Sequence, residues 1–209
     1  MTSILRVDKI QANSGSNITL TSPLVLESGT TISTGIATMH ATSADNNKAE
    51  AFWYLNRWDA SDIDTFSNVA NTSNDRFDIP IDGYYEIFYQ VHIGVTGETG
   101  SLRDMAIIIS QTTGGTESSV SSAHNRFRDG AQDDTSDETM STHAIIQCST
   151  GDQIKMYYYA NTDTGTAFDV YAKVGEEENT HLYSNLDQSS SMSAAAIPKA
   201  THCWLKKIA

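Results

Sequence analysis

The sequence predicts an all-β protein in which a β-sandwich domain follows a short β-rich segment. Two patterns support this class along the 209 residues. Short runs of alternating apolar and polar residues recur about every dozen residues, separated by Gly, Pro, Asn and Asp. Helical periodicity is nearly absent, and the one stretch that approaches it, residues 187–196, is so rich in serine that we expect a loop there.

The N-terminal segment carries apolar residues in pairs one position apart. Alternation at period two predicts strands with one buried face, and Pro23 and Gly29 predict tight turns between them. One or two hairpins are only marginally stable in water, so such strands need copies of themselves from other chains. We therefore expect an oligomeric β-rich shaft over residues 16–40, with a buried face formed by Ile18, Leu20, Leu24, Leu26 and Ile32.

Residues 41–209 are expected to form one globular domain. Residues 41–48 are polar and predict a turn, and the aromatic cluster from Phe52 to Trp58 marks the entry into a core. Alternating apolar residues from Tyr85 to Val95 give the clearest strand. Further strands are predicted at residues 76–80, 105–109, 142–148, 154–158, 168–174 and 203–208. About eight strands in all is the number found in a jelly-roll sandwich.

The charge balance excludes several classes of partner. Asp and Glu number 26 against 13 Lys and Arg, which gives a formal net charge of −13. Nucleic acids and anionic lipid surfaces are bound largely through cationic side chains, so we expect neither as a partner. The sequence has no apolar run as long as a membrane helix and no signal peptide, so we expect synthesis and assembly in a cytoplasm, without membrane insertion.

The sequence contains no recognisable catalytic motif. It lacks a G-x-S-x-G turn, a P-loop and a pair of histidines at helical spacing, and we expect no enzyme activity, no catalytic residue and no cofactor. Two carboxylate-rich segments, residues 129–138 and 176–178, lack the spacing of a calcium loop and are interpreted as solvated loops.

Cysteines and histidines leave a few alternatives open. Cys148 and Cys203 are interpreted as small buried residues, with a disulfide between them as the alternative. His143 and His202 lie in strands that also carry these cysteines, so a zinc site is a further alternative, but we expect no metal. His92 falls on the side of its strand opposite the core, where a solvated or interface imidazole is expected.

Three consecutive tyrosines end one predicted strand. Tyr158 and its neighbours Tyr157 and Tyr159 must point to opposite faces of a sheet, so one face packs in the core and the other is free for a different contact. Packing within the protomer and packing between subunits are both compatible with this pattern. Exposed Tyr and Trp side chains also suit stacking on sugar rings.

Four motifs follow one another in the globular part: residues 74–89 (NDRFDIPIDGYYEIFY), 106–109 (AIII), 151–154 (GDQI) and 203–205 (CWL). In this order they resemble the heads of the complement-q and tumour-necrosis-factor superfamily. The resemblance implies a jelly roll of about ten strands that assembles as a three-fold trimer. There is no collagen-like stalk, and residues 128–140 and 176–198 look like enlarged loops, so no ligand of the animal family is carried over.

The N-terminal segment has a second resemblance. Residues 17–32 (NITLTSPLVLESGTTI) resemble the shaft repeats of trimeric viral fibres, and residues 4–11 (ILRVDKIQ) are similar to the start of structural proteins of marine bacteriophages. These resemblances imply a trimeric shaft and an anchoring segment over residues 1–15. They assign Ile4, Leu5, Val7 and Ile10 to virion anchoring. The resemblance of the head makes Tyr157, Tyr159 and Trp204 candidates for a head interface near the three-fold axis, with packing inside the protomer as the alternative.

Together these features predict a bacteriophage virion protein. The expected molecule is a homotrimeric fibre that contacts other virion proteins at its N-terminus and a host surface glycan or protein through its head. The alternative is a capsid decoration trimer that stabilises the shell without binding a receptor. A secreted bacterial trimer with a cytokine-like fold is a third interpretation, disfavoured by the absence of an export signal.

Overall fold

The computed structural model describes residues 35–66, 68–95, 102–126, 137–162, 165, 167–172 and 200–208. The chain divides into two units, residues 1–33 and residues 34–209. The predicted anchoring residues and the predicted buried face of the shaft all belong to the first unit and lie outside the described residues. Most of the two carboxylate-rich segments, in the second unit, also lies outside the described residues.

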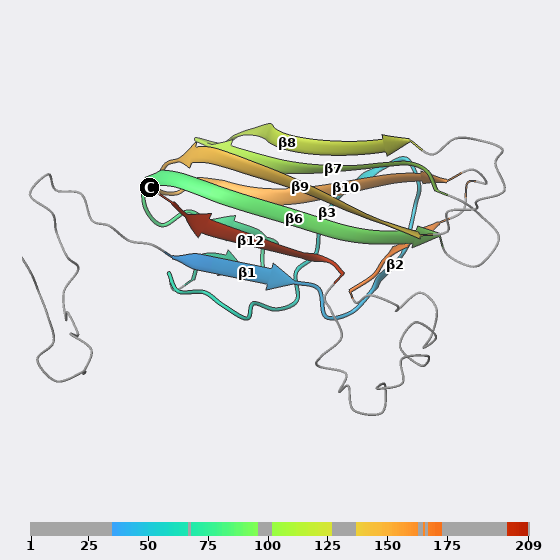
Figure 1. Ribbon diagram of the computed structural model, residues 1–209, viewed down its shortest axis with the longest axis horizontal. Coiled ribbons are helices and arrows are strands. Elements are labelled where there is room, and N and C mark those ends of the chain that lie inside the picture. Colours follow the sequence, from blue (N-terminus) through green and yellow to red (C-terminus); the bar gives the residue numbers. More distant parts are fainter. Residues whose placement is uncertain are drawn as a thin grey trace, which may run out of the picture. The chain divides into compact units, whose positions relative to one another are not determined.

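The second unit is a sandwich of two six-stranded antiparallel sheets (Figure 1). Five strands of the first sheet follow one another as β1 (Ile36–His40), β12 (His202–Lys207), β6 (Gly83–Val95), β11 (Phe168–Val170) and β2 (Asp45–Lys48). The sixth, β9 (Asp137–Cys148), pairs with β6 along the edge opposite to β12. The 13-residue strand β6 is thus the centre of this sheet, and three strands pair with it.

The second sheet is built around β10 (Gln153–Thr162). Its order is β4 (Ala70–Asn71), β5 (Arg76–Asp78), β10, β7 (Leu102–Thr113) and β8 (Thr116–Arg126), and β3 (Trp53–Leu55) also pairs with β10. The described residues contain no helix, and therefore none that is long and apolar enough to cross a membrane. The prediction of an all-β sandwich for the globular part is confirmed.

The core lies between the sheets and follows the alternation in the sequence. In β6, Tyr85, Ile87 and Tyr89 are fully buried, and so are Ile154 and Met156 of β10. Every second residue of a strand faces the same side, so the intervening residues point outward. Burying these side chains supplies the main stabilisation, about 1.5–3 kcal/mol for each large apolar residue.

Buried tyrosine hydroxyl groups have hydrogen-bond acceptors. Tyr89 donates to Oδ1 of the buried Asn56 at 3.1 Å, and Tyr85 donates to the backbone carbonyl of Ile81 at 2.7 Å. Burial raises the pKa of Tyr85 to about 12, so this hydroxyl stays protonated as a donor. A buried hydroxyl without an acceptor would cost free energy, which these contacts avoid.

Several strands differ from the sequence-based expectation, among them β1, β2 and β8, and the short strands β3 and β4 were not predicted. Residues 45–48, predicted as a turn, form β2 because they pair with β11. Strand β8 was not predicted, because its sequence (TESSVSSAHNR) is polar and it forms by pairing with β7. Residues 36–40, expected to end the shaft, pair with β12 and bury Ala37 and Met39 in the core. The described residues contain twelve strands, several of them only two or three residues long.

Candidate functional site

The outward side of the first sheet carries a row of aromatic residues. Thr38, Trp204, Phe88 and His143 are opposite one another on β1, β12, β6 and β9. The rings of Phe88 and Trp204 stack with centroids 5.8 Å apart and 14° between their planes. Their neighbours along the strands, such as Ile87 and Cys203, are buried, so the stacked rings point away from the core. We call the outward side of β1, β12, β6 and β9 around this pair the Trp204 face.

The Trp204 face also exposes large apolar residues. Ile145 of β9 is 58% exposed, and Tyr84 of β6 is 49% exposed. Ile208, directly after β12, is 42% exposed. Exposed apolar residues grouped on one face are characteristic of an interaction surface.

Four histidines that are far apart in the sequence point to the outward side of this sheet. His40 and His202 are opposite each other on β1 and β12, and the His202 ring lies 5.5 Å from the Phe88 ring. His143 Nε2 lies 3.1 Å from Oε1 of Glu86. The fourth, His92, also points outward.

Each of the outer histidines has polar or aromatic neighbours. His40 Nδ1 lies 3.7 Å from a carboxylate oxygen of Asp62. His92 Nδ1 lies 2.7 Å from the hydroxyl of Thr139, and Tyr171 covers its ring at a centroid distance of 5.5 Å. His92 is only 7% exposed in the protomer, so of the two predicted environments the solvated one is wrong and the interface one stays a prediction.

The cysteines face the opposite side from these histidines. Cys148 and Cys203 point into the core, are free thiols and are almost fully buried. They therefore do not converge with His143 or His202, and among the described residues no group of three or more potential ligands is placed to hold a metal ion. Burial raises the pKa of Cys148 to about 12 and that of Cys203 well above its ordinary value, so both are unreactive thiols.

Tyr157 and Tyr159 lie on the outward side of the second sheet. Tyr158 between them is fully buried, as the alternation requires. The Tyr159 ring lies 5.4 Å from the ring of Trp53, which is opposite it on β3. The three predicted interface residues are therefore not brought together within the protomer, because Trp204 belongs to the other sheet.

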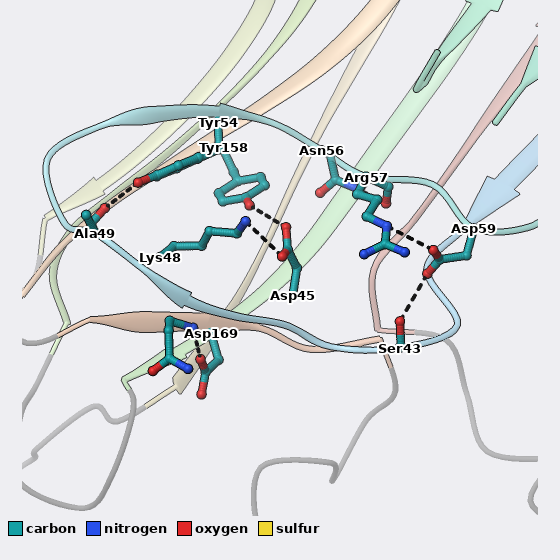
Figure 2. Close-up of polar contacts among 11 residues, drawn as sticks. Ser43, Asp45, Lys48, Ala49, Tyr54, Asn56, Arg57, Asp59, Tyr158 and Asp169 are labelled. Carbon is teal, nitrogen blue, oxygen red and sulfur yellow. Dashed lines mark hydrogen bonds and ion pairs between the residues drawn. The ribbon is translucent and has the colours of Figure 1, made fainter. Parts of the chain in front are cut away.

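A polar network holds the segment that crosses between the two sheets. Figure 2 shows that Asp45 accepts hydrogen bonds from Lys48 Nζ, at 2.8 Å, and from the Tyr158 hydroxyl, at 3.3 Å. The backbone N–H of Asn47 donates to Asp169 Oδ1 at 2.7 Å, which ties β2 to β11. Each of these carboxylates has partners in the protein, so the network is structural.

The same segment is fixed further along by Asp59. Its carboxylate accepts a hydrogen bond from the backbone N–H of Thr42 at 2.9 Å. Figure 2 shows that it also pairs with Arg57, whose Nε lies 3.2 Å away. Burial raises the pKa of Asp59, but the Thr42 bond and the Arg57 charge lower it more, so the net pKa lies below the ordinary value. Carboxylate contacts therefore hold the chain on both sides of β3.

Comparisons with known proteins identify the fold. No family model and no curated protein matches the chain. Two crystal structures of murine APRIL cover 84% of this chain and all of their own, one at pH 5.0 with a TM-score of 0.52 and 11% identity, the other at pH 8.0 with 0.51 and 12%. An Eiger TNF structure from S. frugiperda covers 84% of this chain and 92% of its own, with a TM-score of 0.47 and 7% identity.

The APRIL matches confirm the fold that the sequence predicts for the head. The two antiparallel sheets form a jelly roll of the tumour-necrosis-factor type, at sequence identities that establish the fold alone. The sequence reasoning identified Trp204 and the two outward tyrosines. It missed Phe88, the grouping of the histidines and Trp53, because these depend on which strands become neighbours.

Proposed function

We propose that this chain is a structural protein of a bacteriophage virion, a homotrimeric fibre whose head attaches the particle to its host. The exposed apolar surface of the Trp204 face carries the assembly part of the proposal. Ile145 and Tyr84 are about half exposed in the protomer and flank the stacked Phe88 and Trp204. Covering such a surface with a second copy of the chain removes apolar area from water.

A three-fold arrangement is supported by the resemblance of residues 74–89 to a family of trimeric heads. In a closed ring of three, each contact joins two different patches of neighbouring subunits. The Trp204 face is one such patch. Tyr157 and Tyr159 lie on the other sheet, so their place in a head interface stays a sequence-based prediction and is not part of this proposal.

The virion and adhesion parts of the proposal rest on the sequence. Residues 4–11 are similar to the start of bacteriophage structural proteins, and residues 17–32 resemble a fibre shaft. We expect Ile4, Leu5, Val7 and Ile10 to contact other virion proteins. Weak contacts of each head with a surface glycan or protein become strong when three heads and many fibres engage together. In this proposal assembly and adhesion are the activity, and no reaction is catalysed.

Sedimentation of the purified protein tests the assembly part of the proposal, and antibody labelling of phage particles tests the virion part. The purified full-length chain should sediment with three times the mass of one chain at micromolar concentration, and a monomer would contradict the assembly part. Gold-labelled antibodies against the head should mark the tail or projecting fibres of a phage particle that carries the chain. Even labelling of the capsid with a bare tail would favour the decoration trimer instead.

A further inference from the structure

A groove crosses the outward side of the second sheet, away from the Trp204 face. It has a volume of about 300 Å³ and is lined by Trp53 of β3, Tyr157 of β10, Ile108 and Ser110 of β7, and residues 117–119 of β8. These side chains come from four strands that the backbone pairing holds in fixed register. The groove is therefore part of the sheet itself and does not depend on a loop for its shape.

One wall of the groove is aromatic and accessible. Trp53 is 48% exposed, and its ring is supported from the side by Tyr159 at 5.4 Å. Ile108 is opposite Tyr157 on the adjacent strand and contributes an apolar floor. A flat ring held in place by its neighbours offers an apolar surface without a large loss of conformational entropy on binding.

The other wall is polar and centred on Glu117. Its carboxylate accepts hydrogen bonds from the Ser110 hydroxyl and from Lys155 Nζ, the latter at 3.3 Å. Tyr157 also donates to it, and together with burial this raises the pKa of Tyr157 to about 12. Burial alone would raise the pKa of Glu117, but the bonds from Ser110, Tyr157 and Lys155 lower it, so the carboxylate is ionised at neutral pH.

Glu117 retains capacity to bind a ligand. A carboxylate has about four lone-pair sites for hydrogen bonds, and the Ser110, Tyr157 and Lys155 bonds use three of them. Ser118 and Ser119 beside it are exposed and add hydroxyl groups that donate and accept. The groove thus combines the fixed ring of Trp53 on β3 with the ionised carboxylate of Glu117 on β8.

Charge and size define the ligand class. An ionised carboxylate in a chain of net charge −13 repels acidic ligands. A groove of about 300 Å³ is at the lower end of the range for small-molecule sites. A neutral pyranose fits, because one side of its ring presents C–H groups to an aromatic surface and its edge presents hydroxyl donors to a carboxylate.

We infer that this groove binds a neutral glycan, with Trp53 stacking on a pyranose ring and the remaining lone pair of Glu117 accepting a hydrogen bond from a hydroxyl group of the same glycan. The biological role of this site, adhesion to a host surface, rests on the proposed function. Glycan binding by the groove does not depend on it. Tyr157 and Ser110 act as positioning residues, since they hold the Glu117 carboxylate in its orientation.

The test uses the full-length chain and defined sugars. The tetrasaccharides of glucose, galactose, mannose and N-acetylglucosamine are titrated with the protein and followed by saturation-transfer NMR and calorimetry, with sialyllactose as the acidic probe. At least one neutral tetrasaccharide should bind, and more tightly than sialyllactose. No binding of any neutral sugar, or binding of the acidic probe alone, would overturn the inference.

Matched variants locate the binding. Trp53→Ala and Glu117→Gln should each weaken it about tenfold or more, because each removes a principal contact. Trp53→Phe keeps a ring and should retain most of the affinity. Phe52→Ala removes the 62%-exposed neighbour of Trp53, which does not line the groove, and should bind as wild type. Equal affinity of wild type, Trp53→Ala and Glu117→Gln would place the sugar elsewhere and refute the assignment.

Sedimentation of the same samples separates this inference from the proposed function. A trimer that binds no neutral sugar would refute the groove assignment and leave the fibre proposal standing. A monomer that binds a neutral sugar through Trp53 would keep the groove and contradict the trimeric fibre.

Discussion

Phe88 and Trp204 stack on neighbouring strands with 14° between their ring planes, on the side of the first sheet that faces away from the core. One residue is near the middle of the chain and the other near its end, so only the pairing of β6 with β12 joins them. An aromatic pair contributes about 0.5–1.5 kcal/mol beyond the area it buries. On an open sheet face this surface is available to a partner subunit.

The first prediction concerns assembly through this pair. Trp204→Glu should weaken trimer association at least tenfold, because it removes a large apolar contact and places a charge in the subunit interface, at a cost of about 2 kcal/mol or more. Analytical ultracentrifugation over a concentration series measures the change. The control is Phe52→Glu, which adds the same charge at an exposed aromatic residue directly before β3. This variant should stay trimeric. Unchanged association of Trp204→Glu would exclude this face from the interface.

A second prediction concerns the shaft. Leu24→Asp together with Leu26→Asp should loosen or abolish association of the N-terminal segment, because burying unpaired charges costs several kcal/mol. Cross-linking within residues 16–33 of the full-length chain measures the effect, and the matched variant Leu24→Val with Leu26→Val should associate as wild type. A shaft that still associates with both aspartates would mean that these leucines are not on its buried face.

A third prediction tests the buried hydrogen bond between Tyr89 and Asn56. Tyr89→Phe leaves Asn56 Oδ1 without its 3.1 Å donor, and the free energy of unfolding should fall by about 1–3 kcal/mol. Urea unfolding at fixed protein concentration gives the value. The matched change at an exposed tyrosine, Tyr84→Phe, should alter stability by less than about 0.5 kcal/mol. Equal effects of the two changes would contradict the importance of the buried bond.

The lowered pKa of Asp59 predicts a dependence of stability on pH. Because the folded pKa lies below the unfolded value of about 3.9, ionised Asp59 stabilises the fold above that value and loses its contribution as the pH falls through the folded pKa. The melting temperature of Asp59→Asn should therefore be lower than that of wild type at pH 7, and the two should converge near pH 2. A difference between the two melting temperatures that grows as the pH falls would contradict this prediction.

The free thiols give a fifth prediction. Neither Cys148 nor Cys203 should react with a thiol reagent in the native protein, because both are buried and protonated. Both should react at once in 6 M guanidinium without a reducing agent. Rapid reaction of either thiol in the native protein would contradict its burial. A thiol that appears only after reduction would mean that the cysteines form a disulfide.

Much of the head was predictable because its strands carry a local signal. The alternation from Tyr85 to Val95 and the predicted strands at 142–148 and 154–158 correspond to β6, β9 and β10. Strands β2 and β8 were not predictable in this way. Their polar sequences become strands only through pairing with β11 and β7, a contact between distant parts of the chain.

The candidate sites depend even more on long-range pairing. A sequence pattern tells which residues of a strand share a face, but it does not tell which sheet the strand joins. Tyr157 and Trp204 were therefore placed in one interface, although their strands belong to different sheets. Glu117 gave no signal at all, since its groove exists only where β8 lies beside β7.

The position of β1 has a mechanical consequence for a protein that is held at one end and pulled at the other. Any tension carried by the chain ahead of Gly35 reaches the head through β1. Hydrogen bonds hold this strand on both sides, to β12 and to residues 60–65. Directly before β1, the carbonyl of Gly35 accepts a hydrogen bond from the Lys207 N–H at 3.0 Å. In the fibre that we propose, a pull along β1 would shear both rows of bonds together, so the unfolding rate of the head under load would be set at this strand.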